Sequence, residues 1–160
     1  MSGKFERVFL GVGSNRGERK FYLEAARILL ERIPETRFLR NSTVIETDPV
    51  GGPLQGKFLN AVWEIETALS PGELKDRLRQ IEDQLGRERT VPNAPREIDL
   101  DILFYGNQIV QETRLEIPHP RLHERFFVLV PLAEIAPDFT HPTLKRTAHE
   151  LLEDLKKSCP

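Results

Sequence analysis

Hydrophobic residues recur along this chain at two different spacings, which predicts that strands and helices alternate. Apolar residues occupy every second position from Leu59 to Ile65, as expected for a strand over residues 58–67 with one buried face. A helix is predicted directly after this strand, because Ser70 and Glu73 have the spacing of a capping box. The order of such segments along the chain is therefore a guide to the fold.

The other segments complete a known order of elements. Strands are expected at residues 7–12, 38–47 and around 98–104, and a helix with a buried stripe from Tyr22 to Ile33 follows the first strand. The order strand, helix, strand, strand, helix, strand is the split βαβ arrangement, an α+β fold with two helices on one face of an antiparallel sheet. We expect the other face to stay open to a ligand, and extra C-terminal elements, including an amphipathic helix, to follow this core.

Composition is typical of an ordinary globular protein. The 160 residues are 39% hydrophobic and 30% charged, so we expect a single domain, 1–160, with a core that needs no disulfide. A net charge of −2 argues against broad attraction to nucleic acid or to a membrane surface. The first apolar run is short and flanked by charge, and the one cysteine, Cys159, lies near the end of the chain. These features favour a cytoplasmic location.

Two carboxylates interrupt the hydrophobic strand near residue 100. Asp99 and Asp101 would project on one face while Ile98, Leu100 and Ile102 enter the core, and the two Asp Cβ atoms would lie roughly 7 Å apart. Asp is disfavoured in strands and like charges repel, so the pair favours a divalent cation such as Mg²⁺ between the carboxylates. For this motif taken alone, a solvent-facing sheet edge is the alternative.

Three arginines precede or flank the aspartates. Arg87, Arg89 and Arg96 present planar groups whose donors match phosphate oxygens. Beside a metal-binding pair of aspartates, they favour a polyphosphate ligand. The alternative is a set of exposed ion pairs with nearby glutamates, which contribute little to stability.

Aromatic and amide side chains indicate a second type of ligand. Phe58 and Asn60 share one strand face, a combination that suits a flat heterocycle with hydrogen-bonding edges. Phe127 would supply an opposing ring, although Phe126 and Phe127 also fit an ordinary core position.

Two further motifs have weaker interpretations. Residues 11–17 follow a strand and contain three glycines, but the third glycine is displaced from the dinucleotide-binding pattern, so a structural turn is favoured. His119 and His123 have helical spacing, but Pro120 and the lack of a third ligand disfavour a metal site. His119 remains either a donor to a phosphate or ribose oxygen or a partly buried structural histidine.

Taken together, these segments resemble the 6-hydroxymethyl-7,8-dihydropterin pyrophosphokinase (HPPK) family over almost the whole chain. The matching segments are, in order, residues 13–15, 58–62, 81–82, 86–89, 95–103, 117–121 and 125–129. The resemblance implies a ferredoxin-like βαββαβ core. It also implies ATP-dependent transfer of pyrophosphate to the reduced pterin, which yields the pterin diphosphate and AMP in folate biosynthesis.

The resemblance also implies roles for individual residues. Asp99 and Asp101 would hold two Mg²⁺ ions, and Arg87 and Arg96 would stabilise the transferred group. The ATP site would comprise Glu82, Arg87, Arg89, Arg96, Arg114, His119 and Arg125. The pterin site would comprise Phe58 and Phe127 on the two ring faces, with Asn60 and the backbone around Thr47, Val50 and Gly51 at the ring edge. Small molecules would be the substrates of a monomeric enzyme that binds neither nucleic acid nor membrane.

The chain departs from the family pattern in one loop. Residues 92–95 read Pro-Asn-Ala-Pro where many relatives have Arg-Trp-Gly-Pro, and position 58 is Phe where some have Tyr.

Two other functions stay open at this point. One is a non-catalytic module that binds RNA on an open sheet, which two acids on that sheet disfavour. The other is a kinase that transfers only the γ-phosphoryl group.

Overall fold

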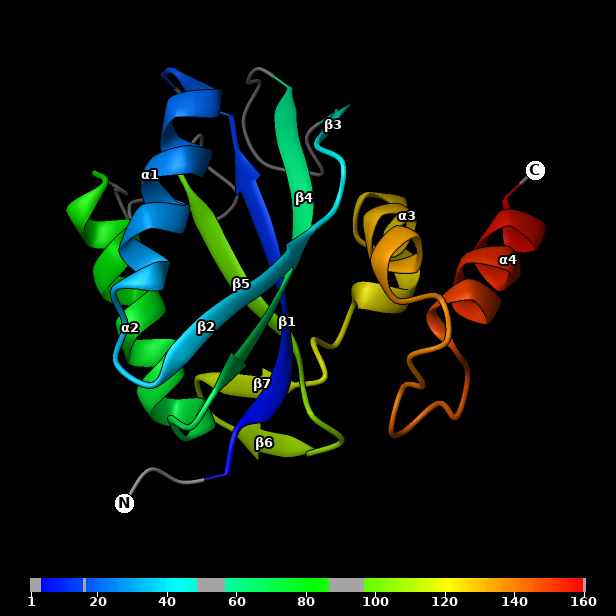
Figure 1. Ribbon diagram of the computed structural model, residues 1–160. Helices are drawn as coiled ribbons and strands as arrows, with labels where there is room; N and C mark the ends of the chain where they lie inside the picture. Colours follow the sequence, from blue (N-terminus) through cyan, green and yellow to red (C-terminus); the bar gives the residue numbers. More distant parts are fainter. Residues whose placement is uncertain (1–3, 16, 49–56, 87–96, 160) are drawn as a thin grey trace.

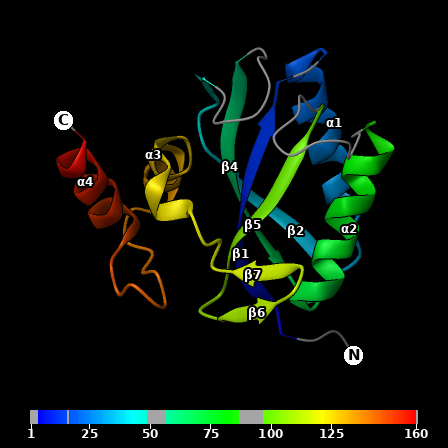
Figure 2. The same ribbon diagram turned by 180° about the vertical axis from the view of Figure 1, so that it is seen from behind.

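The computed structural model describes residues 4–15, 17–48, 57–86 and 97–159. Its elements are β1 (Glu6–Ser14), α1 (Arg19–Glu31), β2 (Thr36–Asn41), β3 (Ile45–Thr47), β4 (Phe58–Thr67), α2 (Pro71–Gln84), β5 (Asp99–Tyr105), β6 (Val110–Glu112), β7 (Leu115–Ile117), η1 (Leu122–Glu124), α3 (Phe126–Ile135) and α4 (Ala148–Ser158). Helices α1 and α2 lie on one side of the main sheet, and α3 and α4 lie on the other (Figures 1 and 2). In the described part of the chain, no helix has the length and hydrophobicity needed to cross a membrane.

The main sheet has the strand order of the predicted fold. Its order is β2-β4-β1-β5, with the short β3 also paired to β4, and every pairing is antiparallel. The α+β prediction is confirmed, but the strand expected over residues 38–47 is two strands. Ser42 lies between them, where its N–H donates to the Val62 carbonyl (2.9 Å) and its Oγ accepts from the Val62 N–H (2.8 Å). The Ser42 side chain thus replaces one of the two backbone hydrogen bonds at this break.

The first hydrophobic core lies between the sheet and helices α1 and α2. Strand residues such as Val8, Trp63 and Leu100 meet helix residues such as Leu30 and Leu78 in this layer. The buried stripe of α1 runs through Leu23, Ala26 and Leu30 rather than starting at Tyr22.

A second core covers half of the face that was expected to be open. Phe9, Val62 and Leu103 pack there against α3 and α4, so the prediction of an open face is wrong for this half of the sheet. A bulge contributes to this core. Phe9 pairs with Phe104 and Leu10 with Ile102, which leaves Leu103 as an extra residue in β5. Both Leu103 and Phe104 therefore reach the second core.

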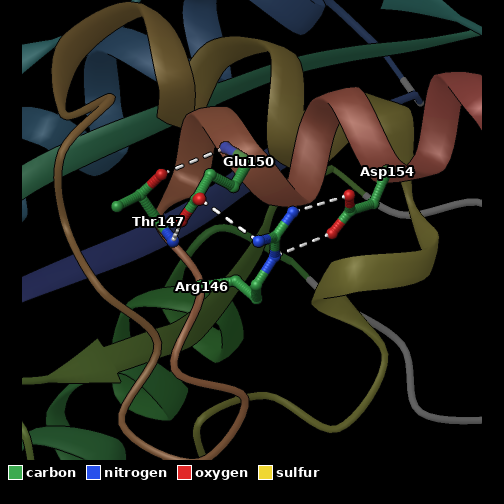
Figure 3. A network of polar contacts seen from close by, with 4 residues as sticks. All are labelled: Arg146, Thr147, Glu150 and Asp154. Atoms are coloured by element: carbon green, nitrogen blue, oxygen red, sulfur yellow. Dashed lines mark hydrogen bonds and ion pairs between the residues drawn. The ribbon is translucent and has the colours of Figure 1, made fainter.

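Capping boxes define the start of two helices. At α2, as the sequence predicts, Ser70 Oγ accepts from the Glu73 N–H (3.2 Å) and the Glu73 carboxylate accepts from the Ser70 N–H (3.0 Å). Thr147 and Glu150 make the same pair of bonds at α4, which the sequence interpretation missed (Figure 3). Beside it, Arg146 donates to the carboxylates of Glu150 and Asp154, so the chain is fixed where it enters α4 (Figure 3).

We expect Ser70→Ala to lower the free energy of unfolding by about 1 kcal/mol, because the first turn of α2 loses its side-chain acceptor. Urea denaturation followed by circular dichroism measures this loss. Ser158→Ala is the matched control, since the Ser158 hydroxyl is exposed at the end of α4 and donates only to the Leu155 carbonyl. Equal unfolding midpoints for the two variants would contradict the capping role.

Candidate active site

The candidate site lies on the half of the sheet that the second core leaves uncovered. Gly13 of β1 pairs with Asn60 of β4 on one side and with Asp99 of β5 on the other. Gly11, two residues earlier, lies opposite Asp101. Because paired strands are about 4.8 Å apart, the backbones of Asn60 and Asp99 are separated by about 10 Å. The predicted ring-binding face and the carboxylate pair are therefore neighbours across a strip of glycine.

The glycine at position 13 is required by close packing. A Cβ atom there would lie 3.0 Å from Asn60 Oδ1 and 3.4 Å from Phe58 Cδ1. At Gly11, a Cβ atom would lie 3.3 Å from Leu103 Cδ2. A side chain at position 13 would therefore press on the Asn60 amide in one wall of the site.

A pocket that is partly open to solvent lies over this strip. Eight of the predicted site residues line it: Asp99, Asp101, Thr47, Phe58, Asn60, His119, Arg125 and Phe127. Asn60 Nδ2 donates to Thr47 Oγ1 (2.5 Å), which fixes the orientation of the amide. Residues that the sequence interpretation missed also line the pocket: Gly11, Val12, Gly13, Asp48, Ala61, Leu103 and Val128.

Helix α3 brings Phe127 to the pocket. Phe127 is half-buried, packs against the second core and also lines the pocket, whereas Phe126 is 38% exposed. The helix is tied to the link between β2 and β3, because the N–H and hydroxyl of Thr43 donate to the Glu134 carboxylate (2.8 and 2.6 Å). The two interpretations of this Phe pair, core and ring-binding wall, are thus both consistent with the position of Phe127.

His119 is held in a neutral form that can donate a hydrogen bond. Its backbone N–H donates to the Leu103 carbonyl of β5 (3.0 Å), and its Nδ1 accepts from the Arg121 N–H (3.3 Å). Burial, together with the positive charge of Arg125, lowers the pKa of His119 to about 4, although Asp99 opposes this shift. At neutral pH the single ring proton is therefore on Nε2, which makes this atom a donor.

A second pocket adjoins the first at Asp101 and His119. It is lined by Lys75, Asp101, Ile102, Arg114, Leu115, Glu116, His119 and Pro120. The predicted ATP residue Arg114 lies here, together with Lys75 of α2, for which the sequence had no distinguishing signal. Asp101 and His119 line both pockets, so the two pockets are neighbours.

The remaining predicted residues have other positions. Glu82 is buried in α2 and lines neither pocket; its carboxylate accepts from the Leu100 N–H of β5 (2.8 Å). Predicted residues Val50, Gly51, Arg87, Arg89 and Arg96 lie outside the described residues.

The donor set of the pocket fits Mg²⁺. Asp99 and Asp101 are half-buried and line the same pocket, while no group of three His, Cys, Asp or Glu ligands occurs among the described residues. Mg²⁺ in nucleotide sites is bound through one or two carboxylates, with phosphate oxygens and water completing the octahedron. The pair of aspartates that lines this pocket is consistent with that pattern.

Comparison with known proteins decides the family. A model of the 7,8-dihydro-6-hydroxymethylpterin-pyrophosphokinase (HPPK) family matches residues 9–137. The chain belongs to the HPPK family. A pyrophosphokinase of Bacillus subtilis is 46% identical over 128 residues, which cover 80% of this chain and 77% of the relative. A Pseudomonas aeruginosa relative of the same name is 39% identical over 155 residues and covers 97% of this chain and 93% of the relative.

A solved structure shows the same HPPK fold. The wild-type HPPK-DHPS of Plasmodium falciparum superposes with a TM-score of 0.75 at 16% identity, over 94% of this chain. The chain spans 41% of that protein, so the likeness concerns one part of it.

We expect NMR titration of the ligand-free protein to show the His119 ring losing its proton near pH 4. In the urea-unfolded chain, the histidines should titrate near pH 6.5. Because the folded-state pKa is the lower one, the unfolded state binds more protons between these values. Stability should therefore be lost as the pH falls from about 6.5 through about 4. His119→Gln should reduce this loss, and a His119 titration at pH 6 or above would contradict the neutral form.

Proposed function

We propose that this HPPK-family chain transfers pyrophosphate from ATP to 6-hydroxymethyl-7,8-dihydropterin, giving the pterin diphosphate and AMP in folate biosynthesis. Relatives in Bacillus subtilis and Pseudomonas aeruginosa are named 2-amino-4-hydroxy-6-hydroxymethyldihydropteridine pyrophosphokinase. The structural observation that carries the proposal is the row Asn60–Gly13–Asp99 across three strands. It sets a wall for a flat ring beside a pair of carboxylates.

The pterin would lie over the glycine strip. Phe58 and Phe127 both line the pocket and would contact the two faces of the ring. The Asn60 amide, oriented by Thr47, would bind the edge of the ring, where a pterin offers both donors and acceptors. Val50 and Gly51, which the sequence assigns to the same edge, stay a prediction.

ATP would extend from the carboxylate pair into the second pocket. His119 lines both pockets, Arg125 lines the first, and Arg114 and Lys75 line the second. Donors and cations in this arrangement match the oxygens of a polyphosphate. The contribution of Arg87, Arg89 and Arg96 rests on their position in the sequence.

The chemistry would depend on position and charge. The pterin hydroxyl would attack the β-phosphorus of ATP, the bond from that phosphorus to the α-β bridging oxygen would break, and AMP would leave. Two Mg²⁺ ions bound by Asp99 and Asp101 would neutralise phosphate charge and lower the pKa of the hydroxyl. The protein would hold the two substrates in line, while Arg125 and His119 would stabilise charge on the phosphate oxygens. The substrate itself is the nucleophile, so no covalent enzyme intermediate is required.

Product analysis tests this function directly. The purified protein, MgATP and the reduced hydroxymethylpterin should yield AMP and the pterin diphosphate in equal amounts. ADP and a pterin monophosphate would indicate a γ-phosphoryl kinase instead. Absence of turnover with binding of RNA would favour a non-catalytic module.

We further propose that the protein acts as a monomer in the cytoplasm on free small molecules. Its net charge of −2 supports small-molecule substrates over nucleic acid or an anionic membrane. Sedimentation analysis at several protein concentrations tests the oligomeric state.

We expect Asp99→Asn to lower turnover by ~10²-fold or more while the fold is kept, because the variant loses one of two charged metal ligands. Turnover is measured over a range of Mg²⁺ concentrations, and circular dichroism checks the fold. Asp138→Asn, an exposed change away from both pockets, is the control. Near-normal turnover of Asp99→Asn at limiting Mg²⁺ would be incompatible with a ligand role.

We expect Gly13→Ala to weaken pterin binding by about 1–3 kcal/mol, the usual range for an inserted methyl group in a packed site. The new Cβ would lie 3.0 Å from Asn60 Oδ1, so the amide would have to shift by a few tenths of an ångström, and it would contact the Phe58 ring at 3.4 Å. Calorimetry with pterin and with an ATP analogue separates the two sites, and ATP affinity should change little. Gly72→Ala is the control because no atom lies within 4 Å of its added Cβ. Unchanged pterin affinity would show that the strip does not form the floor of the ring site.

A further inference from the structure

The strand that carries the two aspartates is at the edge of the main sheet. β5 pairs with β1 on one side and is the last strand in the order β2-β4-β1-β5. An edge strand has backbone groups that no neighbouring strand satisfies, and such a segment shifts more easily than a central one. A metal site on it therefore needs additional support.

Glu82 of α2 supplies that support at the centre of the motif. Its Oε2 accepts from the N–H of Leu100, the residue between Asp99 and Asp101, at 2.8 Å. Glu82 is only 3% exposed, and Leu100 is 1% exposed. Both residues that make this bond are therefore shielded from water.

A second bond fixes the same edge three residues later. The N–H of His119 donates to the Leu103 carbonyl at 3.0 Å. Between these two bonds, β5 is held along its outer edge by a side chain from α2 and by the segment that carries His119. Asp99 and Asp101 directly precede and follow Leu100 in the strand. A shift of the Leu100 amide would therefore move both carboxylates.

We propose that Glu82 is a positioning residue, which fixes the spacing of the Asp99 and Asp101 carboxylates for Mg²⁺ by holding the Leu100 amide. This inference rests on the proposed function, because that function requires a divalent cation at the aspartate pair. Removal of a group that orients metal ligands without contacting the metal commonly lowers metal affinity 10–100-fold.

Three substitutions separate this role from a direct or electrostatic one. Glu82→Gln keeps an acceptor oxygen at full reach and removes the charge, whereas Glu82→Asp keeps the charge and shortens the side chain by one methylene. Glu82→Ala removes both. Asp76→Ala, an exposed acidic residue on the same helix, is the control.

Two measurements do not depend on turnover. Hydrogen exchange by NMR reports on the Leu100 amide, and calorimetry measures Mg²⁺ binding to the protein saturated with a non-hydrolysable ATP analogue. Glu82→Asp and Glu82→Ala should each raise Leu100 exchange and weaken Mg²⁺ binding roughly tenfold or more. Glu82→Gln and Asp76→Ala should stay within about threefold of the parent protein in both measurements.

The outcomes either support or overturn the proposal. If Glu82→Gln loses as much Mg²⁺ affinity as Glu82→Ala, the carboxylate acts through its charge or as a ligand, and positioning is wrong. If Glu82→Asp binds Mg²⁺ normally, reach to Leu100 does not matter, and the proposal also fails. Circular dichroism checks that each variant folds, and a roughly tenfold loss of Mg²⁺ affinity in Glu82→Gln overturns the proposal even if Glu82→Ala does not fold. Failure of the parent protein to form AMP would instead refute the proposed function, while exchange at Leu100 would still report on the bond.

Discussion

Electrostatic repulsion between the carboxylates of Asp99 and Asp101 is the constraint around which this site is built. Two like charges on one face of an edge strand destabilise it unless a cation is bound, and they bind a cation well only if the strand is held still. The hydrogen bonds from Leu100 to Glu82 and from His119 to Leu103 hold it along its outer edge. The proposed metal chemistry thus depends on the hydrogen bonds that hold the edge strand in place.

The second face of the sheet is divided between packing and chemistry. In one half, Phe9, Val62 and Leu103 meet α3 and α4 in a hydrophobic core. In the other half, Gly13 of β1 lies between Asn60 and Asp99, and all three residues line the pocket. The packed half supports the open half, because α3 is anchored in the core and presents Phe127 to the pocket. The hydrophobic core thus holds in place one of the elements that form the pocket.

The sequence predicted the fold well wherever a local pattern was sufficient. Alternation between Leu59 and Ile65 predicted the central strand β4, and the capping box at Ser70 predicted the start of α2. The sequence failed at α3, whose ten residues are hydrophobic almost all round and include Pro131, so that no amphipathic helical period was visible. The cover over half of the second face was missed for this reason.

In the candidate site, too, local patterns predicted some features and the tertiary structure decided the others. Spacing along single strands determined that Asp99 and Asp101 share one face of their strand and that Phe58 and Asn60 share one face of theirs, because side chains alternate along any strand. Only the tertiary structure decided that these two pairs lie on the same face of one sheet, separated by Gly13. It also decided that Glu82 contacts the strand backbone and that His119 is neutral. Those outcomes depend on strand pairing and on packing between segments that are far apart in the chain. Local sequence patterns do not show which distant segments will pair or pack together.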